Sequence, residues 1–398
     1  MAESVAYRQL SGSLSRFSAL LAVLALPLAL GAAAYFYMEH NGHIVTGMDN
    51  QIVWGMPHVF AVFMIVAASG ALNVASTASV FGKTIYKPIA PLSALLAISL
   101  LVGGLTVLVL DLGRSDRLIV AMTHYNFKSI FTLNVFLYNG FIIIGAVYLW
   151  FMLERRMNRY AKMAGMAAFI WRLMLTTGTG SIFGFLVARE AYDTAILAPT
   201  FIVFSFAYGT AIFILVLLAA CRWDAQPIAD ELLARLKNLL GVFVAASLYF
   251  VTVYHLTKLY MTRYDDFERF ILVDGGVYTL LFWVGQVELG GILPLALLFR
   301  ARTSRGGIVA ACALVVLGGL AQMYVTIIGA QAYPQILFPG MAESSSFFDG
   351  VVHPYAPSLP EVLLGLGGVA LAASIVAVAL RALALLPARL DQVAQPQG

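Results

Sequence analysis

The sequence has little charge. Only 11% of its 398 residues are Asp, Glu, Lys or Arg, whereas 61% are hydrophobic and the mean hydropathy is +0.88. A soluble domain typically carries about 25% charged residues, so this composition excludes an ordinary soluble protein and predicts a chain embedded in a lipid bilayer. The net charge of +4 is modest and forms no basic arm or cluster, which excludes a nucleic-acid-binding surface.

Cysteine is almost absent. Cys221 and Cys312 lie far apart beside apolar runs, and the chain contains no C-x-x-C motif. Without that spacing we expect no iron–sulfur cluster, covalently attached haem or zinc knuckle, and we predict no metal site. Both residues suit the role of small apolar packing groups. A cysteine-bound electron carrier would therefore belong to another subunit.

Long apolar runs, in contrast, fill the chain. A membrane-spanning helix needs about 20 mainly apolar residues, and ten segments reach that length. They are 17–38, 55–80, 89–111, 129–153, 165–187, 197–221, 239–261, 273–299, 307–331 and 361–386. The first run has a cleavage-like end, but its apolar core exceeds the usual signal-peptide core of about 7–15 residues, so we expect a retained helix. The sequence predicts an all-α, polytopic integral membrane protein with about ten transmembrane helices.

Basic residues are unevenly divided between the two sides of such a protein. With alternating spans, 16 of the 24 Lys and Arg residues share a side with both termini, seven lie on the other side, and Arg172 lies within a span. Cytoplasmic loops are enriched in Lys and Arg, so we predict cytoplasmic N- and C-termini in a bacterial inner membrane. All six histidines then fall on the outer side.

Three outer segments carry groups that exchange protons. His58 begins the second span, Asp111 ends the third, and His124 and Tyr125 precede the fourth. A quinone headgroup needs donors to its two carbonyls, a proton-exchanging group and an apolar slot for its tail. These residues suit that ligand, although a hydrogen-bonded interfacial histidine explains His58 equally well.

The stretch VLDLGRSDR continues from the end of the third span. A carboxylate at a helix C-terminus is disfavoured by the helix dipole, so Asp111 needs a compensating partner. Arg114 is the nearest cation, and Gly113 fits a left-handed helix cap. We expect Arg114 either to pair with Asp111 in a surface network or to hold it ionised beside a ligand.

Two charged residues fall within spans. Arg172 lies in the fifth and Glu288 in the eighth, at similar estimated depths. Charges in the hydrocarbon layer are costly, and they usually pair or mark a functional path. We expect a buried Arg172–Glu288 pair, with snorkelling of Arg172 to the inner surface as the alternative. A proton path through both residues is the functional hypothesis.

Two other functions remain open at this point. A haem b anchor would need two axial histidines at matched depth, and only His58 and His255 meet that condition. A secondary transporter or ion-translocating subunit would suit the glycine-interrupted helices and the charged pair within the membrane. No inverted repeat is visible, however, and the polar candidates gather at one surface.

Several motifs together resemble the NrfD/polysulfide-reductase (PsrC-like) membrane-subunit family. They are WGMPH at 54–58, AASG at 67–70 and DLGR at 111–114. The runs 69–76, 109–131 and 172–189 are most similar to the DsrP group, the membrane subunits of the sulfite-reductase-associated DsrMKJOP complex. Ser115 departs from the family pattern, which often has proline there. The resemblance covers most of the chain.

The resemblance implies a haem-free subunit that exchanges electrons between the quinone pool and a periplasmic ferredoxin-like (DsrO-like) iron–sulfur subunit. A DsrJ-like multihaem cytochrome c and DsrM-like and DsrK-like subunits would complete the complex, with menaquinone or ubiquinone as the ligand. His58, Asp111, and His124 or Tyr125 match the family's quinone-site positions. The implied fold is two four-helix bundles plus peripheral helices, divided as 1–54 (N-terminal helix and outer loop), 55–187 (first bundle), 188–331 (second bundle) and 332–398 (outer loop and C-terminal helix).

Overall fold

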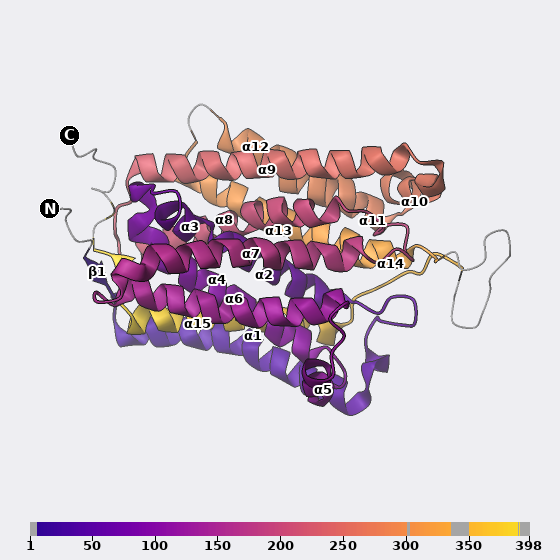
Figure 1. Ribbon diagram of the computed structural model, residues 1–398, viewed down its shortest axis with the longest axis horizontal. Helices are drawn as coiled ribbons and strands as arrows, with labels where there is room; N and C mark the ends of the chain where they lie inside the picture. Colours follow the sequence, from indigo (N-terminus) through magenta and orange to yellow (C-terminus); the bar gives the residue numbers. More distant parts are fainter. Residues whose placement is uncertain (1–5, 301–302, 336–349, 389, 391–398) are drawn as a thin grey trace.

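The helices of the computed structural model run roughly parallel in one elongated body (Figure 1). The structure describes residues 6–300, 303–335, 350–388 and 390. Of the predicted outer loop at 332–360, residues 336–349 lie outside the described part. We call the end that holds both chain termini the terminal end, and the end that holds α5, α10 and α14 the loop end.

Every predicted span corresponds to a helix or a stacked series of helices. The α-helices are α1 (Leu14–Asn41), α2 (Met56–Ala71), α3 (Asn73–Ser79), α4 (Ala90–Leu110), α5 (Leu118–Thr123), α6 (Ile130–Leu153), α7 (Ala161–Gly184), α8 (Leu197–Trp223), α9 (Asp230–Leu259), α10 (Asp265–Arg269), α11 (Val277–Leu280), α12 (Leu293–Leu298), α13 (Arg305–Tyr324), α14 (Ala330–Ala332) and α15 (Leu359–Ala382). Three π-helical segments interrupt them: η6 (Phe270–Asp274), η7 (Leu281–Ile292) and η8 (Val325–Gly329). The 3₁₀ turns are η1 (His43–Val45), η2 (Thr84–Ile89), η3 (Ser115–Arg117), η4 (Asn158–Tyr160) and η5 (Thr262–Tyr264).

Nine helices of the described residues are long and apolar enough to cross a membrane. The tenth predicted span is α7, which has 24 residues but is less apolar because it contains Arg172 and the Thr- and Gly-rich run 176–181. It packs against α6 and α8 within the same body. The all-α, polytopic membrane class predicted from the sequence is therefore confirmed.

We use the names first and second bundle for two sets of helices that form one continuous body, since α8 also contacts α2 and α7. In the first bundle, α2 packs on α4, and α6 packs on both α4 and α7; in the second, α8 contacts α9 and α13, and η7 packs on α13. The pair α1 and α15 lies at the edge, where α15 contacts α4 (Figure 1). The predicted division of the chain at residues 54, 187 and 331 stays a prediction.

Helices α2 and α8 join the two bundles with almost no side chain between them. A Cβ atom at Gly70 would lie 1.5 Å from the Ser205 carbonyl oxygen, and one at Gly209 would lie 2.1 Å from the Ala71 nitrogen. Small residues at such contacts let two backbones approach closely, which is how helices associate without a hydrophobic driving force in lipid. Glycine is therefore required at both positions.

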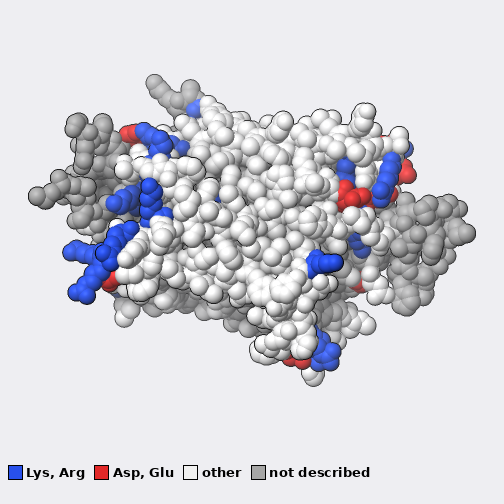
Figure 2. Space-filling view, in the orientation of Figure 1, with Lys and Arg blue, Asp and Glu red and all other residues white. Residues whose placement is uncertain are grey.

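Charged side chains separate the two ends of the molecule. Lys and Arg gather at the terminal end, both signs occur at the loop end, and the belt between them is nearly free of charge on the visible face (Figure 2). At the terminal end, β1 (Tyr7–Arg8) pairs antiparallel with β2 (Leu386–Pro387), which ties the two termini together. This distribution matches the uneven charge count of the sequence. The cytoplasmic assignment of the termini stays a prediction.

Candidate functional site

His58 and Asp111 contact each other at the loop end. His58 lies in the first turn of α2, and Asp111 caps the C-terminus of α4. Their Nδ1 and Oδ2 atoms are 2.8 Å apart; the Asp111 side chain is fully buried, and that of His58 is 15% exposed. Because Asp111 engages Nδ1, the other ring nitrogen, Nε2, is the one left to bind a ligand.

Aromatic rings surround this pair. The Trp54 indole stacks on the His58 imidazole, with centroids 6.0 Å apart and planes inclined by 25°. Trp54 also meets Phe131 at 6.2 Å and the edge of Phe183 at 5.8 Å. Phe183 is buried on α7, whereas Phe131 on α6 is 46% exposed. A planar ligand that enters from the lipid would therefore meet aromatic faces beside an imidazole.

A second set of contacts holds the start of α2 in place. The Met56 backbone N–H donates to the Tyr355 hydroxyl (2.7 Å), which donates to the Glu361 carboxylate (2.6 Å). Burial, and then the bond to Glu361, raise the pKa of Tyr355, so its hydroxyl remains a donor. The same carboxylate accepts the Gly47 N–H at 2.8 Å. The C-terminal span thus positions the helix that carries His58.

The loop that carries Trp54 is fixed from the opposite side. The Gln331 side-chain oxygen accepts the backbone N–H groups of Val53 (3.0 Å) and Trp54 (3.1 Å). Arg189 donates to the Gln51 carbonyl (2.7 Å) and to the Gln331 carbonyl (3.1 Å). Gln331 on α14 and Arg189 in the connection between α7 and α8 therefore preorganise the ring that stacks on His58.

Arg114 pairs with Asp116 rather than with Asp111, and its assignment to a ligand site stays a prediction. Its guanidinium makes two hydrogen bonds of 3.1 Å to Asp116, and both side chains are largely exposed. These bonds lower the pKa of Asp116. The expectation that Arg114 pairs with Asp111 is wrong because the chain turns at Gly113, which has the predicted positive φ of 67°, and the carboxylate faces His58 instead.

His124 and Tyr125 do not contact the His58–Asp111 pair. His124 is exposed at the end of α5, where Nδ1 contacts the Thr123 hydroxyl at 3.1 Å. Tyr125 is 39% exposed and packs edge to face on Phe127 and Phe136. No contact within the described part of the chain joins either residue to His58 or Asp111. Their assignment to a ligand site stays a prediction.

The predicted pair of Arg172 and Glu288 does not form. Arg172 is buried on α7 and donates to the Asn73 side-chain oxygen (3.1 Å) and the Ser69 carbonyl (3.4 Å). Glu288 is exposed on η7. Among the described residues, no ion pair joins Arg172 to Glu288. Helix packing instead places the Arg172 guanidinium beside uncharged oxygen atoms of α2 and α3. A proton path through both residues stays a prediction.

His255 pairs with a carboxylate of its own. Its Nδ1 lies 2.7 Å from Oε2 of Glu268, whose side chain is fully buried. His255 lines a cavity in the second bundle to which His58 contributes no atom. The two histidines that a haem b would need therefore do not line a shared cavity here, and the haem b hypothesis stays a prediction.

Some residues of the site do not stand out in the sequence. Trp54 has the position of an interfacial anchor, and Tyr355 and Glu361 lie about 300 residues from His58 along the chain. The signal for Glu361 is the S-x-x-E spacing at 358–361, which predicts a helix start with a reach-back carboxylate. Nothing local predicts that this carboxylate and Tyr355 also hold α2.

The fold and these contacts define a polytopic helical membrane protein with a histidine–carboxylate pair at one rim. The family model described as "Polysulphide reductase, NrfD" matches residues 44–335. Since this match covers well over half of the chain, the protein belongs to the NrfD family. The predicted family resemblance is thereby confirmed, and the closer likeness to the DsrP group stays a prediction.

Two relatives extend over nearly the whole chain. The Hdr-like menaquinol oxidoreductase integral membrane subunit of Archaeoglobus fulgidus is 28% identical over 396 residues, which cover 97% of this chain and 98% of the relative. A selenate reductase subunit of Mesobacillus selenatarsenatis is 22% identical over 377 residues, which cover 85% and 87%. The similarity therefore includes both bundles and the edge helices.

Proposed function

We propose that this protein is the membrane subunit of a redox complex that exchanges electrons between the quinone pool and an iron–sulfur partner subunit. The observation that carries the proposal is the His58–Asp111 pair, 2.8 Å long, at a bundle rim beside the stacked Trp54. The relative from Archaeoglobus fulgidus, named as a membrane subunit of a menaquinol oxidoreductase, supports the same chemistry.

The side chains fit a quinone headgroup. Nε2 of His58 can hydrogen-bond a carbonyl or accept a hydroxyl proton, and the Trp54 and Phe131 rings provide planar apolar faces. Oxidation of a quinol releases two protons and two electrons. His58 takes one proton, Asp111 stabilises the imidazolium, the second proton passes to water, and the electrons pass to the partner. Reduction of a quinone reverses these transfers.

The redox metal is assigned to partner subunits. Both cysteines of the chain are buried and separate, so they provide no cluster ligands. We place a ferredoxin-like (DsrO-like) subunit at the loop end on the periplasmic side, near a DsrJ-like cytochrome c, with DsrM-like and DsrK-like subunits elsewhere in the complex. The position of the His58–Asp111 pair at the loop end supports this arrangement, since electron transfer needs a short distance.

Substitution of His58 in the intact complex tests the site. We expect His58→Ala to lower quinone-dependent electron transfer by about 10²- to 10⁴-fold, the usual contribution of a proton-transfer group. Asp116→Asn, in the next turn of the same loop but exposed and paired with Arg114, is the matched control. Wild-type turnover of a fully assembled His58→Ala complex would exclude this site.

Cysteine labelling tests the predicted orientation. Ser15 is exposed at the terminal end and Lys128 at the loop end. With cytoplasmic termini, a membrane-impermeant maleimide applied to intact cells should label Lys128→Cys, and it should label Ser15→Cys only after lysis. The reverse pattern would place the quinone site on the cytoplasmic side.

A further inference from the structure

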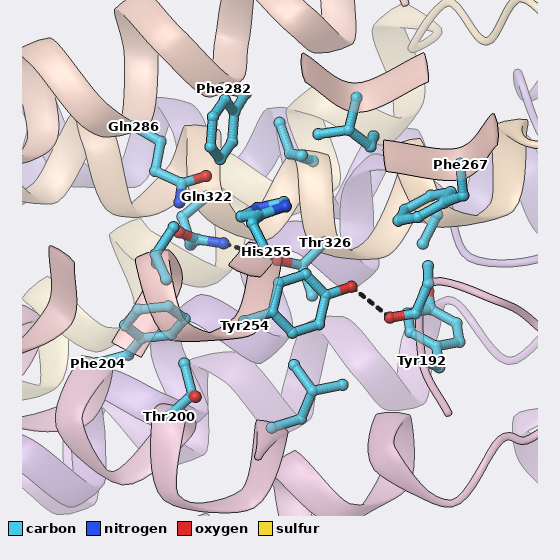
Figure 3. Close-up of a pocket in the computed structure, with 16 residues that line it drawn as sticks. Tyr192, Thr200, Phe204, Tyr254, His255, Phe267, Phe282, Gln286, Gln322 and Thr326 are labelled. Atoms are coloured by element: carbon cyan, nitrogen blue, oxygen red, sulfur yellow. Dashed lines mark hydrogen bonds between the residues drawn. The ribbon is translucent and has the colours of Figure 1, made fainter. Parts of the chain in front are cut away.

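A cavity lies inside the second bundle, around His255 (Figure 3). Its lining includes Gln286, Gln322 and Thr326, and the space open to the centres of water molecules is about 40 Å³. A single water needs about 10–15 Å³ by this measure, so the cavity has room for water. An adjoining cavity of about 30 Å³, also lined by Gln286 and Gln322, extends it toward Gly290.

Polar atoms in this cavity have no protein partner. Gln286 is only 6% exposed, and neither its side-chain nitrogen nor its oxygen has a hydrogen-bond partner among the described residues. Outside the lining, Oε1 of Glu268, the carboxylate that contacts His255, also has no hydrogen-bond partner among the described residues. Gln322 donates to the Thr326 hydroxyl at 2.9 Å. An unsatisfied buried polar group costs about 1–3 kcal/mol, which bound water removes.

The backbone around the cavity is unusual. Three π-helical segments contribute to its wall, with Ile271 from η6, Gln286 from η7 and Thr326 from η8. π-helical turns are rare, well under 1% of residues in typical proteins, and they occur frequently at functional sites. Their convergence on one polar cavity is a second, independent sign of a binding site.

The His255–Glu268 pair reaches this cavity through His255, which lines it, and most neighbouring donors are already engaged. The Tyr254 hydroxyl donates to the Ala191 carbonyl at 2.5 Å, and Lys258 donates to the Glu190 carbonyl. The other titratable or charged side chains on the surrounding elements include Glu190, Tyr192, Asp193, Tyr208, Tyr249, Arg263, Tyr264, Asp265, Asp266, Arg269, Asp274, Tyr278, Glu288, Tyr324 and Tyr333. The Nε2 atom of His255, which lines the cavity, therefore remains for exchange with water, and Glu268 takes part through its contact with His255.

We propose that this cavity is a proton-exchange site, in which ordered water on Gln286, Gln322 and Thr326 connects with the His255–Glu268 pair. The pair takes up one proton from a hydronium ion and returns it to water; no electron moves and no other bond changes. This inference does not depend on quinone binding at His58, because the two pairs lie in different bundles.

Proton uptake by the purified complex, with no quinone added, tests the proposal. The measurement runs between about pH 5 and 8, the range in which histidine side chains in general exchange protons. We expect the double variant His255→Leu/Glu268→Leu, which leaves no unpaired buried charge, to take up one proton fewer per molecule over that range than the wild type. Asp266→Asn, an exposed acid on the same helix as Glu268, serves as the control for handling and assembly.

Equal proton uptake by the double variant and the wild type would overturn the proposal. If the double variant fails to fold, a second measurement on the wild-type protein tests the proposal. An experimental map of the wild-type protein, at a resolution that shows ordered water, should contain water hydrogen-bonded to Gln286 and near Glu268. A dry cavity in that map would equally overturn the proposal.

Discussion

The two bundles contain the same pair of chemical groups in different surroundings. In each, the Nδ1 atom of a mostly buried histidine contacts a fully buried carboxylate, at 2.8 Å in the first bundle and 2.7 Å in the second. His58 stacks on Trp54 near the half-exposed Phe131, and His255 packs edge to face on Tyr254 and Phe282. What differs is that His255 also lines a cavity that contains the unsatisfied amide of Gln286.

This difference teaches that a histidine–carboxylate pair does not by itself specify a ligand. The carboxylate fixes the orientation of the ring in both places. The surrounding side chains then decide whether a flat organic molecule or water can reach the other ring nitrogen. We can separate binding of a flat organic molecule from binding of water by substituting residues in or around one pair. The other pair then serves as the reference.

The largest effect is expected for the carboxylate of the first pair. Asp111→Asn removes the charge that stabilises the His58 imidazolium, so quinone-linked electron transfer in the intact complex should fall by about 10²-fold or more. Glu268→Gln should lower the same rate by less, since the second pair binds no quinone in this proposal. Equal losses in the two variants would contradict the assignment of different ligands.

Removal of the Tyr355 hydroxyl should have the next largest effect. Tyr355→Phe leaves the Met56 N–H and one oxygen of Glu361 without this partner, which should lower the free energy of unfolding by about 1–3 kcal/mol. Thermal unfolding in detergent measures this loss. Tyr125→Phe, an exposed tyrosine at the same end, is the control. If the two variants unfold alike, Tyr355 does not hold α2.

The stacked Trp54 ring should make a smaller contribution, which affects quinone binding specifically. Trp54→Ala removes the contacts with His58 and Phe131, and such aromatic pairs are worth about 0.5–1.5 kcal/mol. We expect the Michaelis constant for quinone to rise about 2- to 12-fold, with recovery in Trp54→Phe. Proton uptake at the second pair should not change in either variant. A change there would show that the two surroundings are coupled.

Much of the fold could be predicted because each span is long enough to be recognised from its own sequence. About 20 apolar residues are needed to cross the hydrocarbon layer, and all ten predicted segments are helical. The fifth is less apolar because it contains Arg172. The candidate site was predicted only in part, since His58 and Asp111 meet but Arg114 turns to Asp116. A cation three residues from Asp111 can pair with Asp111 or with Asp116, and the local spacing does not decide between them.

The sequence by itself determined the membrane class, the helical spans, the uneven charge at the two ends and the position of every histidine outside the terminal end. These follow from hydropathy and from the cost of burying charge in lipid, which act on each segment separately. The tertiary structure alone decided which carboxylate contacts which histidine. It also decided that Arg172 donates hydrogen bonds to uncharged oxygen atoms and that Glu288 is exposed. Those outcomes depend on how helices distant in the sequence pack side by side, and no local pattern encodes them.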